Sequence, residues 1–434
     1  MSESRYRDAP ALKSVIWAIV LSLIFLVLVA RYLKEATLAR EHRKGTSNQL
    51  HGVRHLPCAP FKFPNGQGTD KFFDGRRAAQ KWRKLYGSMY SIWSGFKREI
   101  ILTKPEQVKV FYKDSHDHVK ATDNNAGWLF AELLGSCVGV VSQQQWKRVR
   151  KPFDCHFNKA ASKARVNRFI DETAQFIHDS NPAGREIVIN AANDLKYCPF
   201  FMVARLFFGK LSTGQKDELR KLGALREDLF RGAFKGGINR YSITKYLPGS
   251  ALPCLRKFQS RWECFVRQAY ETATAQEGCA IVPLWESVGS GELSLKELLQ
   301  TLDECLFANL DVTTHAVSWS VLTISQEMDL QQKLYDEIES HVGQEENEEA
   351  YESYIQRDNT LLAACIFEAS RLHPVLPFSN PESANTRKVV DSYVIPKNTD
   401  VIVDAYAINV DNPYWEEGKT FDPYRHLGTK DGVS

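Results

Sequence analysis

Apolar positions recur every three or four residues through the middle of the chain, from about residue 126 to residue 340. This spacing is typical of helices that bury one face and expose the other. The longest such run covers residues 295–340 with few helix breakers, and its middle is apolar on nearly every side. The pattern therefore predicts one long helix through the interior, well beyond the average of about 11–12 residues.

Alternating and β-branched segments flank this helical region. Residues 88–103 alternate around a Ser-Gly pair, which predicts a β-hairpin, and residues 104–114 carry Pro near the start of a short helix. A later helix is expected to end at Pro374, and residues 387–410 hold short β-like runs separated by turn signals. Together these elements predict a mainly α fold with small β-sheets, an α+β protein.

The amino-terminal segment 14–30 is apolar and uncharged over its whole length. A helix of that length spans about 26 Å, near the lower limit for crossing a bilayer. More basic residues follow the segment than precede it, so we expect residues 1–13 to form a short lumenal tail and the bulk of the chain to lie in the cytosol. A cleaved signal peptide is the alternative, although no small-x-small site closes the apolar run.

Residues 31–64 follow this predicted transmembrane anchor as a basic linker and a proline-rich hinge, and residues 65–434 form the predicted folded domain. Proline fixes φ and stiffens the chain, so the hinge is expected to set the posture of the domain on the membrane. The single spanning segment disfavours a transporter.

Charge and cysteine content argue against several other classes of protein. The net charge of +4 is small for 434 residues, whereas a dedicated nucleic-acid binder concentrates basic residues on one face. The nine cysteines are scattered and form no CxxC pair, so neither a zinc framework nor a disulfide framework is indicated. His51 and His55 stand four residues apart in a linker with no third ligand, so a metal site there is disfavoured.

One pair of opposite charges lies in apolar surroundings. Glu368 and Arg371, in the segment EASR, are three residues apart and therefore share one face of a helix. Because the neighbouring residues are apolar, we expect the pair to be at least partly buried and to need further partners. From these residues alone, a simple surface ion pair is the alternative.

The segments EASRLHPVLPF and YVIPKNTDVIVDAYAINVDNPYWEEGKTFDPYRHLG together resemble the cytochrome P-450 family of haem-thiolate monooxygenases. E-x-x-R with its His-Pro, the IPKNT turn and the F-x-P-x-R segment occur in the family's order. The resemblance implies that Arg425 joins Glu368 and Arg371 in a structural cluster that locks the fold beneath the haem. One carboxylate shared by two guanidiniums supplies the partners that a buried Glu368 needs.

An earlier segment, QQQWKRVRKPFDCHF, resembles the W-x-x-x-R helix of the same family. Trp146 and Arg150 are four residues apart and share a helix face. The resemblance implies that they bind a haem propionate, for which an indole N–H and a guanidinium are suitable donors. The alternative is an exposed basic helix with one packed Trp.

The segment FANLDVTTHAVSW resembles the family's oxygen-activating helix, in which an acid and a hydroxyl relay protons. Ala308 and Asp311 match the family pattern, whereas Asn309 replaces the usual Gly and Val312 the usual Thr. The resemblance implies Asp311 and Thr313 as the catalytic candidates. The shift by one residue turns the hydroxyl about 100° around the helix, and a Thr that bonds a carbonyl of its own helix is the alternative.

The resemblance implies a monooxygenase that oxidises a lipophilic small molecule, with haem b as cofactor and electrons from NADPH through a reductase. The anchor suits a microsomal member whose main domain lies on the cytosolic side of the endoplasmic reticulum. The motifs are most similar to those of fungal enzymes of secondary-metabolite (mycotoxin-type) biosynthesis. No nucleic-acid partner is implied.

The family's axial thiolate stands in a loop of the form F-x-x-G-x-R-x-C-x-G, shortly after the position of Arg425. None of the nine cysteines lies beyond Cys365 and none stands in such a loop, so no metal ligand is assigned. We therefore expect a truncated gene product or an incomplete gene model, with the family fold incomplete at its carboxyl end. The alternative is a catalytically inactive, membrane-anchored protein of the same fold that binds a ligand or a partner.

Overall fold

The computed structural model describes residues 17, 20–27 and 29, and then residues 56–181, 184–273, 278–343 and 348–427. The predicted tail 1–13, the basic linker 31–55 with its two histidines, and the last residues 428–434 lie outside the described residues. Residues 20–27 are helical, with their Leu and Phe side chains exposed. In the described part of the chain, no helix has both the length and the apolar character needed to cross a membrane, so the anchor stays a prediction.

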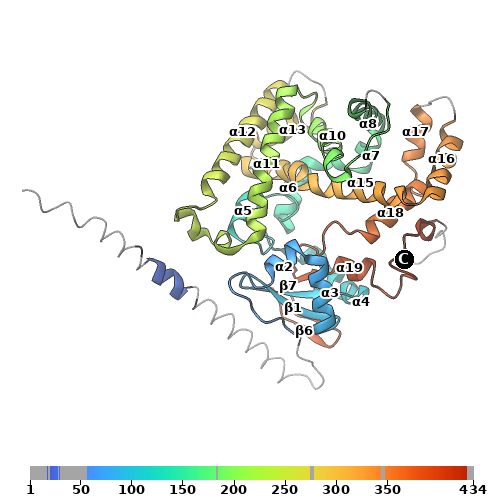
Figure 1. Cartoon of the computed structure of the whole chain (residues 1–434). Helices are drawn as coiled ribbons and strands as arrows, with labels where there is room; N and C mark the ends of the chain where they lie inside the picture. The colour runs from blue at the N-terminus through green and yellow to red at the C-terminus, as the bar shows by residue number, and fades with distance from the viewer. Residues whose placement is uncertain are drawn as a thin grey trace, which may run out of the picture.

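Helices make up most of the described chain, as the apolar spacing predicts (Figure 1). The helices of the first half are α2 Gly68–Phe73, α3 Gly75–Tyr86, α4 Pro105–Phe111, α5 Trp128–Leu134, α6 Gln143–Phe157, α7 Lys159–Lys163, α8 Val166–Ser180, α9 Ala191–Asp194 and α10 Tyr197–Phe208. Those of the second half are α11 Thr213–Lys235, α12 Leu252–Ala273, α13 Ile281–Gly289, α14 Leu295–Asp303, α15 Asn309–Ser325, α16 Met328–Val342, α17 Glu348–Ile355, α18 Leu361–Leu372 and α19 Ala405–Asn409. Short 3₁₀ turns are η1 Tyr112–Asp117, η2 Gly237–Arg240, η3 Ser242–Tyr246 and η5 Pro423–His426, and η4 Glu304–Ala308 is a π-helical turn.

Two small sheets lie with α2, α3, α4 and α19 at one end of the molecule (Figure 1). The strands are β1 Met89–Ser94, β2 Lys97–Leu102, β3 Val119–Lys120, β4 Glu382–Ser383, β5 Lys388–Val390, β6 Tyr393–Ile395 and β7 Asp400–Val403. The larger sheet has the order β1-β2-β7-β4-β3, and β5 pairs with β6 in the smaller one. In the larger sheet β7 runs parallel to β2, with Ile402 opposite Ile101. The last third of the chain therefore completes a sheet that the first third begins.

The β-hairpin predicted over 88–103 is confirmed, because β1 and β2 pair antiparallel. Gly95 at its turn has φ of +60°, a left-handed conformation that favours glycine. The helix expected near 104–114 is α4, which has Pro at its first position. The later helix, α18, ends at Leu372 just before Pro374.

The single long helix predicted over 295–340 is wrong. After α14 the helix changes to the π-helical turn η4 before α15 begins. Helix α15 then ends at Ser325, and α16 begins at Met328. Between them Glu327 has φ −118° and ψ 84°, outside the helical region. The side-chain amide of Gln331 donates to the carbonyls of Ile324 and Ser325 at 3.2 Å each, and so satisfies carbonyls at the end of α15.

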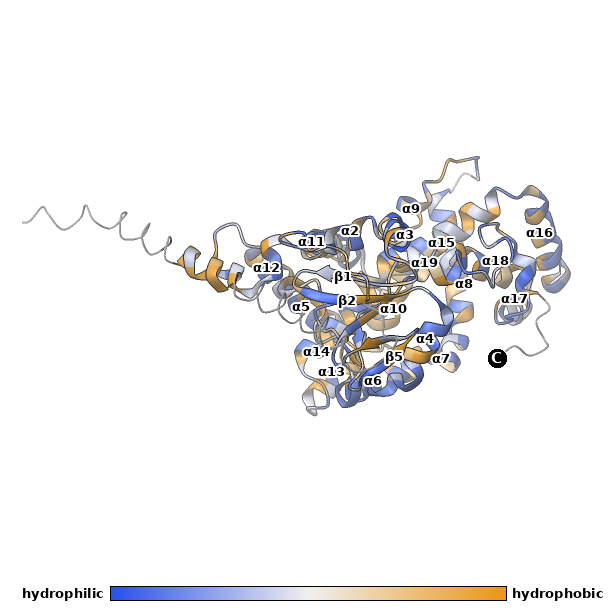
Figure 2. Ribbon diagram, turned by 90° about the horizontal axis from the view of Figure 1, so that it is seen from below, coloured by the Kyte–Doolittle hydropathy of each residue, from blue (hydrophilic) through white to orange (hydrophobic). Residues whose placement is uncertain are grey.

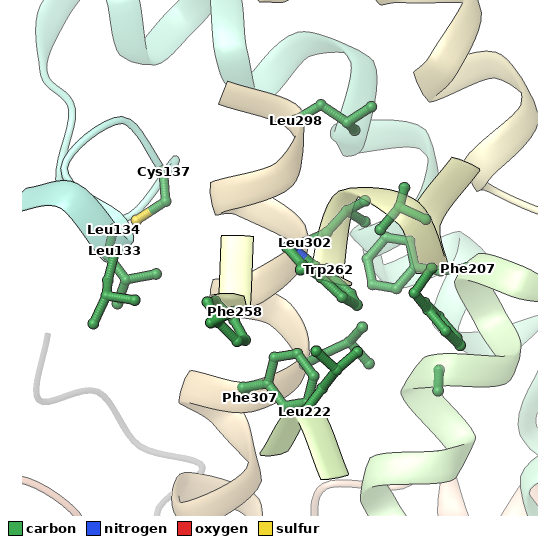
Figure 3. Close-up of a cluster of buried hydrophobic side chains, with 14 of the residues drawn as sticks. Leu133, Leu134, Cys137, Phe207, Leu222, Phe258, Trp262, Leu298, Leu302 and Phe307 are labelled. Atoms are coloured by element: carbon green, nitrogen blue, oxygen red, sulfur yellow. The ribbon is translucent and has the colours of Figure 1, made fainter. Parts of the chain in front are cut away.

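The largest buried apolar cluster lies among α5, α10, α11, α12 and α14 (Figure 3). Phe307 from η4 meets Trp262 of α12 in an edge-to-face contact with 5.2 Å between ring centroids. The indole N–H of Trp262 donates to the Leu299 carbonyl at 2.9 Å, so the buried ring leaves no donor unpaired. This packing fixes the path of α14 and η4, which lead directly into α15.

A buried arginine joins the segment after α11 to the sheet. Arg240 in η2 is 8% exposed, and its guanidinium donates to the carbonyl of Asn125 at 2.5 Å. A Cβ at Gly68, Gly95 or Gly127 would lie 2.3, 2.9 or 2.6 Å from atoms of Arg240. These glycines therefore leave the room that the arginine occupies, and its bonds to Asn125 and to the side chain of Asn65 tie η2 to two earlier segments of the chain.

Candidate active site

Helix α18 carries the segment EASR into the interior. The Thr360 side chain accepts from the N–H of Ala363 and so caps the helix start. Glu368 is fully buried, and Arg371 is 5% exposed. Nε and Nη2 of Arg371 each donate to a separate oxygen of Glu368 at 2.7 Å, which is a bidentate ion pair.

Three further donors reach the same carboxylate. Nε of Arg425, in η5, lies 3.0 Å from Oε1 of Glu368, and the backbone N–H of Asp422 donates to the same oxygen at 3.0 Å. Nε2 of His426 lies 2.9 Å from Oε2. The structure therefore brings the three predicted cluster residues together, and it adds His426, whose only sequence signal is its place beside Arg425.

Donors around Glu368 decide its charge state. Burial by itself raises the pKa of this carboxyl, but the hydrogen bonds from Arg371, the Asp422 N–H and His426 together outweigh burial and lower the pKa to about 2. The carboxylate is therefore ionised at neutral pH. It holds α18 against η5, while Nη1 of Arg371 reaches the carbonyls of Asn409 and Gly418 at 2.7 Å each.

Helix α6 places Trp146 and Arg150 on one face, as their spacing predicts. The Arg150 guanidinium lies 5.1 Å from the centre of the Trp146 ring, within reach of a cation–π contact. Trp146 packs against the large apolar cluster, whereas Arg150 is half exposed and donates to Asp154 at 2.7 Å. This is the arrangement of an exposed basic helix with one packed Trp, and the propionate role stays a prediction.

The two candidate residues of the proton relay both lie on α15, but their side chains have different surroundings. The Asp311 side chain is 68% exposed, with Nζ of Lys196 at 4.0 Å from its carboxylate. The Thr313 hydroxyl lies 3.4 Å from the Leu310 carbonyl of its own helix, the contact that the alternative interpretation expects. Thr314, which the sequence did not single out, is buried and donates to the same carbonyl at 2.6 Å.

Two acids that the sequence did not single out, the buried Asp303 and the half-buried Glu304, stand where α14 meets η4. Asp303 is 1% exposed, with Nε of Arg226 at 3.0 Å from its Oδ1, and burial raises its pKa to about 6 against the charge of Arg226. Glu304 accepts the N–H of Gly139 at 3.0 Å, and burial raises its pKa too. They flank the start of a π turn, a form often found at functional sites. No residue type in this stretch signals the turn.

The candidate residues fall into two groups in space. Helix α18 packs against both α15 and η5, so the Glu368 cluster adjoins the helix of Asp311 and Thr313. His315 of α15 makes this contact direct, with Nε2 3.0 Å from the carbonyl of His373. Helix α6, which carries Trp146, packs instead against α7 and α13.

The side chains of the candidate site meet only some of the requirements for binding a porphyrin. The half-exposed Arg150 is a cation that a propionate can reach, but the cysteines do not provide a thiolate for iron. None of the nine forms a disulfide, and burial raises the pKa of Cys137 and Cys305 and brings that of Cys365 to about 11. Among the described residues, no group of three or more His, Cys, Asp or Glu is placed to hold a metal ion. We therefore derive no step through an iron centre.

Comparison with known proteins gives the same result from three directions. The family model for cytochrome P450 matches residues 71–433. "Cytochrome P450 monooxygenase verC" of Clonostachys rogersoniana is 61% identical over 376 residues, which cover 87% of this chain and 74% of that protein. "Cytochrome P450 monooxygenase gliC" of Aspergillus fumigatus is 45% identical over 86% of this chain and 75% of its own length.

Solved structures agree on the fold. Retinoic acid-bound cyanobacterial CYP120A1 superimposes with a TM-score of 0.68 at 17% identity, covering 86% of this chain and 82% of its own. A zebrafish cytochrome P450 with progesterone gives 0.65 at 16% identity, covering 81% and 84%. Identities this low speak for the fold alone, a mainly helical one with small sheets.

The chain belongs to the cytochrome P450 family. The expected enzyme class, an oxidoreductase of the monooxygenase type, is confirmed by its fungal relatives, and they favour it over the catalytically inactive alternative.

Proposed function

We propose that the gene for this chain encodes a haem-dependent monooxygenase that inserts oxygen into an apolar small molecule of fungal secondary metabolism. The observation that carries the proposal is the 61% identity to a fungal monooxygenase across most of the chain. The order of the motifs from Trp146 to Arg425 supports it. The electron source that we propose is NADPH through a reductase, the usual donor of this family.

The proposed roles follow the environment of each residue. Glu368, Arg371 and Arg425 form a rigid base, because the first two are buried and the partly buried Arg425 bonds to the same carboxylate. Arg150 is the cation proposed to bind a propionate, in exchange for its exposed pair with Asp154. The exposed Asp311 exchanges protons with water, which suits a group that takes a proton from solvent at its carboxylate.

We also propose that the protein is held at the endoplasmic reticulum membrane, with residues 14–30 as anchor and the folded domain on the cytosolic side. Exposed apolar side chains near the first described residues of the domain support this placement. Phe63, Ile238 and Tyr246 are 75%, 56% and 69% exposed. The amide of Asn65 donates to the carbonyl of Lys235 at 2.9 Å and so brings two of these segments together. Figure 2 shows the short amino-terminal helix as predominantly hydrophobic.

Deletion of the gene in the organism that carries it tests the reaction. We expect the deletion strain to accumulate an apolar metabolite that lacks one oxygen atom relative to a product of the parent strain. The measurement is comparative mass spectrometry of extracts, with ¹⁸O₂ supplied to the parent to trace the inserted atom. Unchanged metabolite profiles, or a product oxygen that comes from water, would contradict the proposed reaction.

Haem binding is tested on purified residues 1–434. We expect haem to bind and the carbon monoxide difference spectrum to lack the band of a thiolate-ligated haem, because none of the nine cysteines stands in the family's ligand loop. An Arg150→Gln variant is expected to bind haem about tenfold more weakly, since it loses one charge-assisted contact. A thiolate band would show that one of these cysteines reaches the iron.

A further inference from the structure

A groove of about 440 Å³ lies between α8 and α10, away from the motif residues described above. Its size falls within the range of sites for small molecules. Phe176 of α8 and Tyr197, Phe201 and Met202 of α10 provide its apolar lining. The rings of Tyr197 and Phe201 are stacked, with 5.7 Å between their centres and 26° between their planes. A flat aromatic group therefore finds a matching surface here.

Basic side chains surround these rings. Lys216 holds its ammonium 5.6 Å from the centre of the Phe201 ring, and the Arg205 guanidinium, 42% exposed, belongs to the same lining. Arg168 of α8 and Lys210, in the segment before α11, belong to the lining as well. A ligand that lies on the rings therefore has cationic groups within reach of its edge.

Two of the three acids in the groove lining are already engaged, and the third, Asp171, is exposed. Oε1 of Glu172 receives both Nε of Arg168 at 3.2 Å and Nη1 of Arg205 at 2.9 Å. On the rim, Asp179 accepts the amide of Gln175 at 2.7 Å. The lining holds four basic side chains, those of Arg168, Arg205, Lys210 and Lys216, against these three acids, so the groove favours an anionic ligand over a cationic one.

We propose that this groove is a second small-molecule site, distinct from the proposed active site, and that it binds a planar aromatic carboxylate. The aromatic part stacks on Tyr197 and Phe201, and the carboxylate pairs with Arg205 and Lys216. The site adjoins the proton-relay helix, because the residue before Tyr197 is Lys196, whose ammonium lies beside Asp311. A ligand held against the start of α10 therefore bears on the same helix end that contacts Asp311.

A cysteine in the groove wall reports on occupancy. Cys198 is partly buried, and burial together with the charge of Glu172 raises its pKa, so its alkylation is slow but measurable. With 2-naphthoate as the probe, we expect at least a tenfold slower reaction of Cys198 with iodoacetamide, followed peptide by peptide by mass spectrometry. The exposed Cys155 and Cys264 lie outside the groove lining and serve as internal references with unchanged rates.

Variants and related probes separate the proposal from non-specific binding. Arg205→Gln and Lys216→Gln are each expected to raise the half-protecting concentration of 2-naphthoate about tenfold, in line with the loss of one charge-assisted contact. Arg267→Gln makes the same charge change on the surface of α12 and is expected to leave that concentration unchanged. Lys216 is exposed, so its variant stays informative if Arg205→Gln loosens the fold.

The proposal is overturned if 2-naphthylmethylamine protects Cys198 as well as 2-naphthoate does. It is also overturned if neither probe protects Cys198 and equilibrium dialysis finds no bound naphthoate, or if neither groove variant weakens the protection. These readouts need neither haem nor turnover, so they are independent of the proposed reaction.

Discussion

At the scale of single residues, the most consequential side chain is Glu368, because two guanidiniums, one imidazole and one backbone N–H share its carboxylate. Glu368→Gln keeps the shape and removes the charge, so it leaves Arg371 buried without its counter-ion. Removing one partner of a buried ion pair costs roughly 3–5 kcal/mol. We expect the free energy of unfolding in urea to fall by that amount.

The matched control for this change is Glu263→Gln on α12. Glu263 also pairs with an arginine, Arg267 at 3.1 Å, but its side chain is 41% exposed and that of the arginine 53%. An exposed pair of this kind contributes at most about 0.5 kcal/mol. Equal losses in the two variants would show that burial of the Glu368 cluster contributes little.

The same carboxylate predicts how stability depends on pH. The folded pKa of Glu368 is lowered to about 2, below the roughly 4.3 of an unfolded Glu. The charged form therefore stabilises the fold above the unfolded pKa, on the order of 3 kcal/mol, and this contribution is lost as pH falls from about 5 toward 2. We expect the difference in unfolding free energy between wild type and Glu368→Gln to shrink over that window. A constant difference from pH 7 to pH 3 would argue against a lowered pKa.

At the scale of elements, the junction around Arg240 depends on glycine at position 127. Gly127 has φ of 100° and ψ of −162°, and a Cβ there would lie 2.6 Å from backbone atoms of Arg240. Gly127→Ala adds a steric clash to an unfavourable backbone conformation, which by itself costs about 1–3 kcal/mol. We expect the variant to lose more stability than that range and to speed hydrogen exchange in η2.

Gly87 offers a close control for this substitution. Its φ of 91° and ψ of −163° nearly equal those of Gly127, but no atom lies within 4 Å of the added Cβ. Gly87→Ala is therefore expected to lower the free energy of unfolding only by the cost of the unfavourable backbone conformation. If thermal unfolding shows the two variants to be equally destabilised, Arg240 does not need the space that Gly127 leaves.

Local signals explain which elements were predictable. Gly95 at the hairpin turn and Pro374 after α18 act through their own φ angles, so the sequence places these boundaries directly. The end of α15 has no such signal, because a side chain seven residues from Ile324, that of Gln331, satisfies its carbonyls. The π turn also has no signal in the sequence, since it depends on how Phe307 packs against α12.

At the scale of the whole molecule, the ordered motifs predict the family and leave much of the site open. Spacing places Glu368 and Arg371 on one helix face, but only the tertiary fold brings His426 and the Asp422 N–H to the same carboxylate. Spacing also gives no measure of solvent exposure. On α15 the side chain of Asp311 is exposed and that of Thr314 is buried, although the two residues are only three apart. The acids Asp303 and Glu304 were not predicted as site residues, because two adjacent acids in a sequence give no sign of how far the fold encloses each of them.

Membrane attachment is the remaining prediction for the whole chain. Residues 20–27 present exposed apolar side chains, including Leu23 at 56% and Leu26 at 60%, which water solvates poorly. Within a spanning helix, an arginine costs roughly 2.5–3.5 kcal/mol in insertion. We therefore expect the full chain in microsomes to resist alkaline carbonate extraction and the double variant Leu23→Arg, Leu26→Arg to be released.

A control with the same two changes elsewhere separates anchoring from general solubility. Leu85 and Val110 are exposed apolar residues of the folded domain, 62% and 48% accessible, so Leu85→Arg with Val110→Arg is expected to stay in the membrane fraction. Protease added outside intact microsomes is expected to digest the folded domain, as a cytosolic orientation requires. Release of the unmodified chain by carbonate would remove the anchor from the proposal, and protection of the domain from protease would reverse its orientation.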